Sequence, residues 1–280
     1  MAEEMAQYKR VVIVGVGLLG GSIGLALRRR GLAEQIVGWG REESLQRPAT
    51  LACVDETNAD VAAACQGADF IVICTPVTMI PELVQQCAAA APAAARITDV
   101  GSTKLRIAEQ LQSVTNFCGS HPLAGGEKSG ADFADSELFL NRSCVVTPGE
   151  STSEELALSV EQLWAQLGAK TLRLPAAEHD AALARTSHLP HIVASCLAGA
   201  TPESLLPLAA TGWSDTTRVA AGGVELWLQI IQENRLPILD ALRGFGQSVQ
   251  QWIEAVEQDD SAKLEELLST GKSIRDSLGN

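Results

Sequence analysis

The sequence predicts an α/β domain built on a doubly wound parallel sheet in residues 1–175, followed by an all-helical C-terminal domain in residues 176–280. In the first part, short apolar runs alternate with helical stretches, a pattern typical of a parallel sheet covered on both faces. Beyond Pro175 these runs disappear, and Ala, Leu, Gln and Glu recur at helical spacing between prolines. We therefore expect two domains of different architecture.

The apolar and β-branched runs of the first part are the expected strands of that sheet. In chain order they cover residues 10–15, 35–38, 69–75, 95–100, 116–120, 143–147 and 170–174. Residues 17–30, between the first two runs, form the expected first helix. It ends in three arginines before Gly31, and basic residues followed by glycine are typical of a helix C-terminus.

Length, charge and the N-terminus exclude several classes of protein. The 280 residues contain no uninterrupted apolar run of the ~18 residues that a membrane span needs. The first residues include Glu3 and Glu4 where an export signal would carry Lys or Arg. A net charge of −13 argues against a nucleic-acid partner, which requires a basic footprint. We expect a cytoplasmic protein that acts on a small molecule and contacts neither nucleic acid nor membrane.

A glycine-rich loop follows the first predicted strand. Gly15, Gly17 and Gly20 have the spacing G-x-G-x-x-G between a strand and a helix. In this context the first glycine permits a tight turn, the second lets the backbone approach a pyrophosphate, and the third lets helix and strand pack closely. The backbone N–H groups that open the helix, at Leu18 and Leu19, would bind the phosphates. The loop predicts a Rossmann-type dinucleotide-binding domain.

The end of the second strand bears on the choice between NAD and NADP. An acid here would hold the ribose 2′-hydroxyl of NAD, but the sequence has Gly40 and then Arg41. An arginine accommodates a 2′-phosphate, which favours NADP, while the neighbouring Glu42 and Glu43 leave NAD open. Thr75 and Pro76 end another strand and are further candidate cofactor contacts, because the carboxyl ends of strands line the ligand crevice.

Two polar segments that follow predicted strands carry the candidate catalytic residues. Residues 98–104 read TDVGSTK and residues 119–127 read GSHPLAGGE. Oxidising an alcohol requires a group that accepts the hydroxyl proton, and histidine suits this near neutral pH. His121 lies at a strand end in the cofactor domain, and Ser102 is a candidate partner that would orient its ring. His179, between Glu178 and Asp180, is interpreted as a structural residue.

Two further segments interrupt the helical domain with polar residues. Residues 187–191 read SHLPH at its beginning, and residues 212–218 read GWSDTTR, as a substrate-binding loop would.

Taken together and in order, the glycine loop, DVGSTK, SHPLAGGE, SHLPH, DTTR and a tryptophan nine residues later resemble the prephenate/arogenate dehydrogenase family of tyrosine biosynthesis. The resemblance implies a Rossmann domain followed by a helical dimerisation domain, and hence a homodimer. It implies that His121 interacts with the substrate's ring hydroxyl, that Ser102 supports it, and that Arg218 binds a substrate carboxylate. It also places Glu127, His188, His191 and Trp227 near the substrate.

The reaction implied by the resemblance agrees with these roles. Hydride leaves the hydroxyl-bearing ring carbon for the nicotinamide while His121 accepts the hydroxyl proton, and the product then loses CO2 and becomes aromatic. Two parallel N–H bonds from Arg218 would fix a carboxylate of the ring substrate. No clustered ligand set suggests a metal.

Two other functions remain open on the sequence. A β-hydroxyacid or ketopantoate-type NADP reductase also joins a Rossmann domain to a helical one, but it relies on a lysine in the helical domain. Beyond residue 178 the lysines are Lys263 and Lys272, both late in the chain. A non-catalytic NADP-binding sensor could use the same fold without needing His121 or Arg218.

Overall fold

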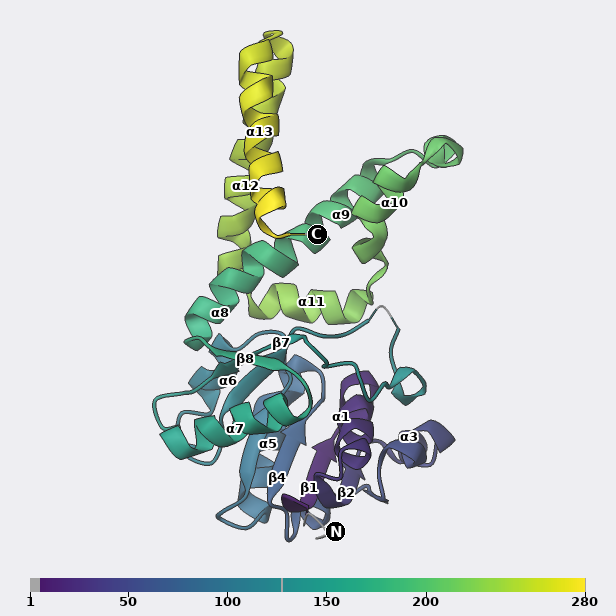
Figure 1. The fold of residues 1–280 in the computed structure, drawn as a ribbon, viewed down its shortest axis with the longest axis vertical. Coiled ribbons are helices and arrows are strands. Elements are labelled where there is room, and N and C mark those ends of the chain that lie inside the picture. Colours follow the sequence, from purple (N-terminus) through teal and green to yellow (C-terminus); the bar gives the residue numbers. More distant parts are fainter. Residues whose placement is uncertain (1–5, 127, 280) are drawn as a thin grey trace.

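The structure is a computed structural model that describes residues 6–126 and 128–279. A sheet domain is followed by a tower of helices that lies over one end of the sheet (Figure 1). The strands are β1 Tyr8–Val14, β2 Ala33–Trp39, β3 Glu56–Asn58, β4 Phe70–Ile73, β5 Arg96–Asp99, β6 Gly119–Pro122, β7 Ser143–Thr147 and β8 Lys170–Arg173.

The helices of the sheet domain cover the strands. They are α1 Leu18–Arg29, α2 Glu42–Leu45, α3 Pro48–Cys53, α4 Val61–Cys65, α5 Ile80–Ala90, α6 Leu105–Gln110 and α7 Glu154–Gln166, with single 3₁₀ turns η1 Val77–Met79 and η2 Ala131–Phe133.

The helical domain begins directly after Pro175. Its elements are α8 Ala176–Leu183, η3 Ala184–His188, α9 Leu189–Ala200, η4 Glu203–Leu208, α10 Thr211–Thr217, η5 Arg218–Ala221, α11 Val224–Glu233, α12 Arg235–Glu257 and α13 Ser261–Ser277. Helices α12 and α13 stand side by side as a long antiparallel pair (Figure 1).

The main sheet has five parallel strands in the order β3-β2-β1-β4-β5, as a doubly wound fold requires. Alternate residues of β1 point to opposite faces. Val11 and Ile13 pack into one hydrophobic core with Trp164 of α7, while Val12 and Val14 pack into a second core with helices α4 and α5. Both faces are therefore buried, and the predicted Rossmann-type fold is confirmed.

The later strands differ from the sequence prediction. Strands β6, β7 and β8 form a separate sheet in which β6 and β7 are antiparallel and β7 and β8 are parallel. One bridge between Ile97 and Phe117 links it to the main sheet. The expectation of one parallel sheet is thus wrong for these strands. The sequence analysis also missed β3, which is short and polar.

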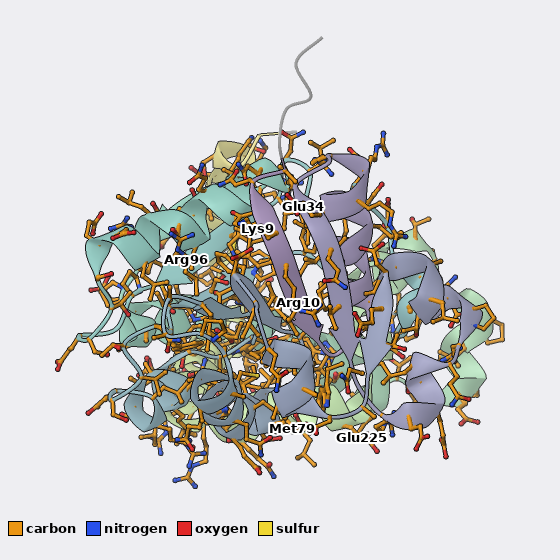
Figure 2. All side chains as sticks on the ribbon, turned by 90° about the horizontal axis from the view of Figure 1, so that it is seen from below. Lys9, Arg10, Glu34, Met79, Arg96 and Glu225 are labelled. Carbon is orange, nitrogen blue, oxygen red and sulfur yellow. The ribbon has the colours of Figure 1, made fainter. Side chains whose placement is uncertain are left out.

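The helical domain lies over the carboxyl end of the main sheet. Its helix α11 contacts η1, the turn that follows β4, and Met79 of η1 lies near Glu225 of α11 when the molecule is seen from below (Figure 2). The opposite end of the strands carries charged side chains such as Lys9, Arg10 and Glu34 (Figure 2). Ligand chemistry is therefore expected where the two domains meet.

No helix among the described residues is long and apolar enough to cross a membrane.

Candidate active site

The glycine loop joins β1 to α1 with backbone packed against backbone. A Cβ on Gly15, whose φ is +104°, would meet the carbonyl oxygen of Cys74 at 2.7 Å, and one on Gly20 would meet the carbonyl oxygen of Gly15 at 2.1 Å. Gly17 differs, because nothing lies within 4 Å of its Cβ position. The loop therefore excludes side chains where it packs and leaves open space at Gly17.

The space at Gly17 fits a dinucleotide phosphate. Gly17 is the N-cap of α1 and no side chain caps this helix end, so the first N–H groups, including those of Leu18 and Leu19, are available to an anion. The Oγ1 atom of Thr75 is buried and has no hydrogen-bond partner among the described residues. A buried hydroxyl group normally forms a hydrogen bond, and a bound cofactor would supply the partner for this one.

Past the end of β2, Arg41 is the N-cap of α2 and its side chain is exposed. Glu42 and Glu43 follow in the first turn of the same helix and are also exposed. Pro76 lies exposed beside Thr75 after β4. The candidate cofactor residues thus follow the carboxyl ends of β1, β2 and β4, and Gly40 rather than an acidic residue comes directly after β2.

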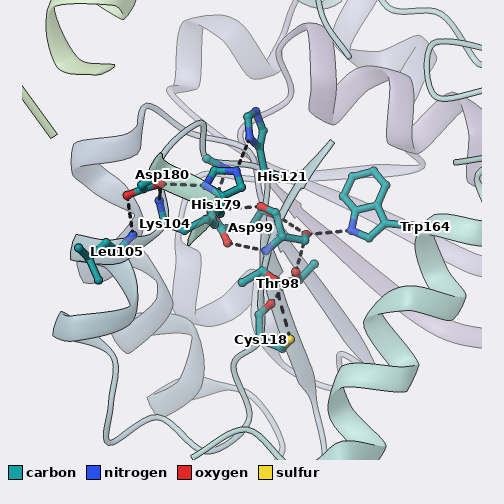
Figure 3. A network of polar contacts seen from close by, with 12 residues as sticks. Thr98, Asp99, Lys104, Leu105, Cys118, His121, Trp164, His179 and Asp180 are labelled. Atoms are coloured by element: carbon teal, nitrogen blue, oxygen red, sulfur yellow. Dashed lines mark hydrogen bonds and ion pairs between the residues drawn. The ribbon is translucent and has the colours of Figure 1, made fainter. Parts of the chain in front are cut away.

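His121 lies on β6, and its ring is held from the helical domain. Its Nδ1 atom is 2.9 Å from Nε2 of His179 on α8, and the two rings meet edge to face with centroids 5.1 Å apart (Figure 3). Nδ1 of His179 is in turn 2.8 Å from Oδ1 of Asp180. His179, interpreted from the sequence as a structural residue, is thus buried and contacts the candidate base directly.

Ser102 lies partly buried in the loop between β5 and α6. Within the described part of the chain, no hydrogen bond joins it to His121, whose Nδ1 is engaged by His179. The orienting contact that the structure describes is thus the one from His179. The role of Ser102 in supporting His121 stays a prediction.

The backbone before His121 is fixed by a buried polar network (Figure 3). Lys104, almost fully buried, pairs with Asp99, and its Nζ donates to the carbonyl oxygen of Ser120 at 2.8 Å. Asp99 also accepts from the Ser120 backbone N–H at 3.1 Å. The indole of Trp164 donates to Ser120 Oγ at 2.8 Å. A buried ion pair supported by this many hydrogen bonds rigidifies the strand that presents His121.

The electrostatic surroundings keep His121 neutral. Burial, and after it the nearby His179, Lys104 and His188, lower the pKa of His121 well below its usual 6.5. A neutral imidazole has one nitrogen free to accept a proton, which is what a general base needs.

The predicted substrate residues of the helical domain form a second cluster. The rings of His191 and Trp227 stack 3.5 Å apart at 12°, and the ring of His188 lies 6.1 Å from that of Trp227. The SHLPH segment brings its two histidines together through the π-helical turn η3, which runs into α9 at His188.

Gly222 and Asn234 complete this cluster, and sequence analysis missed both. A Cβ on Gly222 would lie 2.6 Å from Trp227 Nε1, so the aromatic ring can approach only a glycine. Asn234, buried between α11 and α12, lies 3.1 Å from Nδ1 of His188 and donates to the carbonyl oxygen of Asp180. Nothing in the local sequence marks Asn234, because His188 and Asp180 lie 46 and 54 positions away in the chain. Gly222 is close to Trp227 in sequence, but the sequence does not show that the indole ring packs onto it.

His191 and Trp227 line a cavity between α9, η5 and α11. Nδ1 of His191 is buried without a hydrogen-bond partner among the described residues. Arg218 begins η5, which packs against α9, the helix that carries His191, and the Arg218 side chain is exposed. Glu127, also predicted to be near the substrate, lies outside the described residues.

Comparisons with known proteins show the family of the chain. Residues 23–173 match the family model "Prephenate dehydrogenase, nucleotide-binding domain", and residues 175–270 match "Prephenate dehydrogenase, dimerization domain". A prephenate dehydrogenase of Bacillus subtilis is 31% identical over 96% of this chain and 76% of its own length. One of Lactococcus lactis is 33% identical over 96% of this chain and 77% of its own length.

Solved structures give the same result. The prephenate dehydrogenase of Aquifex aeolicus, in complex with hydroxyphenyl propionate and NAD+, superposes with a TM-score of 0.89 at 29% identity and covers 96% of this chain and 98% of its own. The arogenate dehydrogenase of Synechocystis superposes with a TM-score of 0.82 at 32% identity, over 96% and 99% of the two chains.

The fold and the site thus define a nicotinamide-dinucleotide-dependent dehydrogenase. Within that class, the chain belongs to the prephenate dehydrogenase family. The described residues contain no group of three or more His, Cys, Asp and Glu side chains that could hold a metal ion.

Proposed function

We propose that this chain oxidises and decarboxylates prephenate to 4-hydroxyphenylpyruvate in tyrosine biosynthesis, and that arogenate is the competing substrate. The observation that carries the proposal is the placement of His121. Its Nδ1 is engaged by His179, so Nε2 is the nitrogen that can meet a substrate hydroxyl at the junction of the two domains. Relatives named for both substrates, including a cyclohexadienyl dehydrogenase of Zymomonas mobilis at 31% identity, support the reaction class.

Each site residue has a task that follows from its chemistry. A bound nicotinamide supplies the hydride acceptor. His121 accepts the hydroxyl proton at Nε2, and Arg218 binds a substrate carboxylate through two parallel N–H bonds. The stacked rings of His191 and Trp227 form an apolar wall beside the substrate. His188 and Glu127 are proposed to contact the substrate's remaining polar groups, and Ser102 its ring hydroxyl.

We further propose that the enzyme prefers NADP. Two features support this preference: Arg41, two residues past the end of β2, is exposed and would attract a 2′-phosphate, and Gly40 takes the position of an acid that would repel it. In an Arg41→Ala variant we expect kcat/KM with NADP to fall by a factor of about 10 to 150, because a charged hydrogen bond contributes roughly 1.5–3 kcal/mol, and kcat/KM with NAD to change less than about twofold. An NAD preference in the wild type would contradict this assignment.

We also propose a homodimer formed through the helical domain, with the domain boundary at residues 175/176. The core of the helical domain is small, with Ala184, Ile238 and Ala241 buried together. Helix α12 nevertheless exposes a stripe of large apolar side chains at helical spacing, namely Phe245, Val249, Trp252 and Val256. Such a contiguous exposed stripe is typical of an oligomer interface, and the dimerization model matched by residues 175–270 supports this interpretation.

The lysines of the helical domain do not favour the reductase alternative, which requires a catalytic lysine in that domain. Lys263 and Lys272 both lie on α13, where they pair with Glu266 and Asp276 on the helix surface.

The test of the proposed reaction is the formation of reduced cofactor at 340 nm with prephenate and with arogenate, each offered with NAD and with NADP. Turnover with prephenate supports the proposal. Turnover with neither substrate, despite cofactor binding, would favour the non-catalytic sensor.

A further inference from the structure

Two buried polar residues of the helical domain contact the candidate base and have no task in the reaction as proposed so far. His179 is fully buried and Asp180 is 1% exposed. They connect in series to His121, with 2.8 Å between Asp180 Oδ1 and His179 Nδ1 and 2.9 Å between His179 Nε2 and His121 Nδ1 (Figure 3). We propose that His179 and Asp180 are positioning residues that fix the tautomer of His121, so that its Nε2 lone pair faces the substrate.

The direction of this series of hydrogen bonds follows from Asp180. Its Oδ1 accepts the backbone N–H of Lys104 at 2.8 Å, and its Oδ2 accepts that of Leu105 at 2.9 Å. Backbone N–H groups can only donate, so both carboxylate oxygens act as acceptors. Nδ1 of His179, which shares Oδ1, must therefore carry the proton of that hydrogen bond.

The proton positions then follow one after another. A neutral His179 with its proton on Nδ1 has a lone pair on Nε2, and this atom accepts from Nδ1–H of His121. The proton of a neutral His121 is consequently on Nδ1, and Nε2 is the acceptor. This is the tautomer that a general base needs. The opposite arrangement, with a proton on His121 Nε2, would point a donor at the substrate hydroxyl.

The series crosses the domain junction and is anchored on both sides. His121 belongs to the sheet domain, whereas His179 and Asp180 belong to α8 of the helical domain. Asp180 is tied back to the sheet domain through the N-terminal N–H groups of α6, and Asn234 donates to its backbone oxygen at 2.8 Å. The contacts that hold the two domains together are therefore also the contacts that orient the ring of His121.

Other ionisable groups around His121 do not replace this contact. Lys104 is committed to Asp99 and to the carbonyl oxygen of Ser120. His188 lies near Asn234, with 3.1 Å between its Nδ1 and the Asn234 amide nitrogen. Of the described side chains, His179 is the one whose ring nitrogen lies within hydrogen-bond distance of Nδ1 of His121.

The first variant is Asp180→Asn. An amide cannot accept at both terminal atoms, so it cannot serve Lys104 N–H, Leu105 N–H and His179 Nδ1–H together. Turning its NH2 group toward His179 reverses every proton in the series and puts a proton on His121 Nε2. We expect kcat to fall about 10²-fold or more while KM changes less than threefold, as expected for a base in the wrong tautomer.

The matched control is Asp69→Asn. The Asp69 carboxylate likewise accepts two backbone N–H groups, those of Lys9 at 2.6 Å and Arg10 at 2.9 Å, but it lies at the opposite end of the sheet. This control loses the same kind of backbone contact with no histidine attached. We expect kcat within twofold of wild type. A fall equal to that of Asp180→Asn would assign the effect to folding and overturn the proposal.

A second pair of variants separates hydrogen bonding from packing. His179→Gln keeps an acceptor near the place of Nε2, and His179→Leu fills the space with no acceptor. We expect His179→Gln to retain at least tenfold more kcat than His179→Leu at equal melting temperature. Equal activity of the two variants would contradict an orienting role.

The decisive readout does not require turnover. Side-chain ¹⁵N NMR of the dimeric or monomeric wild-type chain at pH 8 distinguishes a protonated ring nitrogen from one with a lone pair. We expect the His121 signals to show the proton on Nδ1 in the wild type and a shift toward Nε2 in Asp180→Asn. A proton on Nε2 in the wild type would overturn the proposal. This proposal rests on the proposed reaction, but the two can fail separately. If the chain does not turn over prephenate and His121 still carries its proton on Nδ1, only the proposed reaction is rejected.

Discussion

His121 is surrounded by groups that disfavour its protonated form. Burial, followed by the nearness of His179, Lys104 and His188, lowers its pKa well below 6.5. A general base works in the neutral form, so activity should be lost only when the pH falls below this lowered pKa. We expect kcat/KM to be level from about pH 8 down to about pH 6 and to decline only in more acidic solution.

The measurement for this prediction is the pH dependence of kcat/KM at saturating cofactor. The residual activity of His121→Asn provides the control, because it should show no ionisation in the same range. An apparent pKa at or above 6.5 that vanishes in the variant would contradict the environment described for His121.

Arg218 offers a second test at the level of one residue. It lies in η5, which packs against α9, the helix that carries His191. If its guanidinium binds a substrate carboxylate in two parallel bonds, a lysine cannot replace it. We expect Arg218→Lys to raise KM about 10-fold and Arg218→Gln to lower kcat/KM about 10²-fold or more, with unchanged cofactor affinity. Unchanged KM in both variants would remove Arg218 from the substrate site.

Single residues show how far the sequence could predict the site. His121 is predictable because a histidine at a strand end in a cofactor domain is well placed to face the nicotinamide. His179 is not, because its flanking Glu178 and Asp180 are typical of a helix start, and the contact that matters joins residues 58 positions apart. Asn234 escapes prediction for the same reason, since only tertiary packing brings it to His188, and so does the approach of His191 to Gly222.

In the turn between β1 and α1, we expect alanine substitutions at two glycines to have different effects. A Cβ on Gly20 would collide with the Gly15 carbonyl at 2.1 Å, whereas one on Gly17 would meet nothing within 4 Å. We expect Gly20→Ala to destabilise the fold by roughly 1–3 kcal/mol through overpacking. Gly17→Ala should leave the melting temperature nearly unchanged and weaken binding of reduced cofactor about tenfold or more, because the methyl group occupies the phosphate position.

Thermal melts and fluorescence titration with NADPH measure the two effects separately. A Gly17→Ala variant that binds NADPH as tightly as wild type would show that the open space at this glycine is not used by the phosphates.

At the level of elements, apolar runs located the strands but not their pairing. Tyr8–Val14, Phe70–Ile73 and Ser143–Thr147 were found because each is a continuous β-branched or apolar segment. β3 was missed because Glu56–Asn58 is polar and lies at the sheet edge. The antiparallel pairing of β6 with β7 could not be predicted either, since an apolar run has the same composition in both directions.

The arrangement of the whole molecule places the site between two domains and leaves α12 exposed. We expect the chain to be a dimer by light scattering, because the stripe that includes Val249 and Trp252 would otherwise stay in water. The double variant Val249→Glu/Trp252→Glu should be monomeric. The control Gln247→Glu/Gln251→Glu adds the same charge at exposed positions off the stripe of the same helix and should remain a dimer. A wild-type monomer at micromolar concentration would contradict this interface.

The two-domain division followed from the sequence because the change in pattern near Pro175 is abrupt. How the domains dock did not follow, since it depends on buried polar contacts such as Asp180 with the start of α6.

The central claim, that His121 is the base in an oxidative decarboxylation, is tested most directly by stoichiometry in the wild type and in His121→Asn. Reduced cofactor at 340 nm and released CO2 are measured together with prephenate as substrate. We predict equal amounts of both in the wild type. In His121→Asn we predict a rate lower by about 10²–10⁴-fold with unchanged dinucleotide binding. Reduced cofactor without CO2, or a His121→Asn variant that turns over at the wild-type rate, would contradict the account.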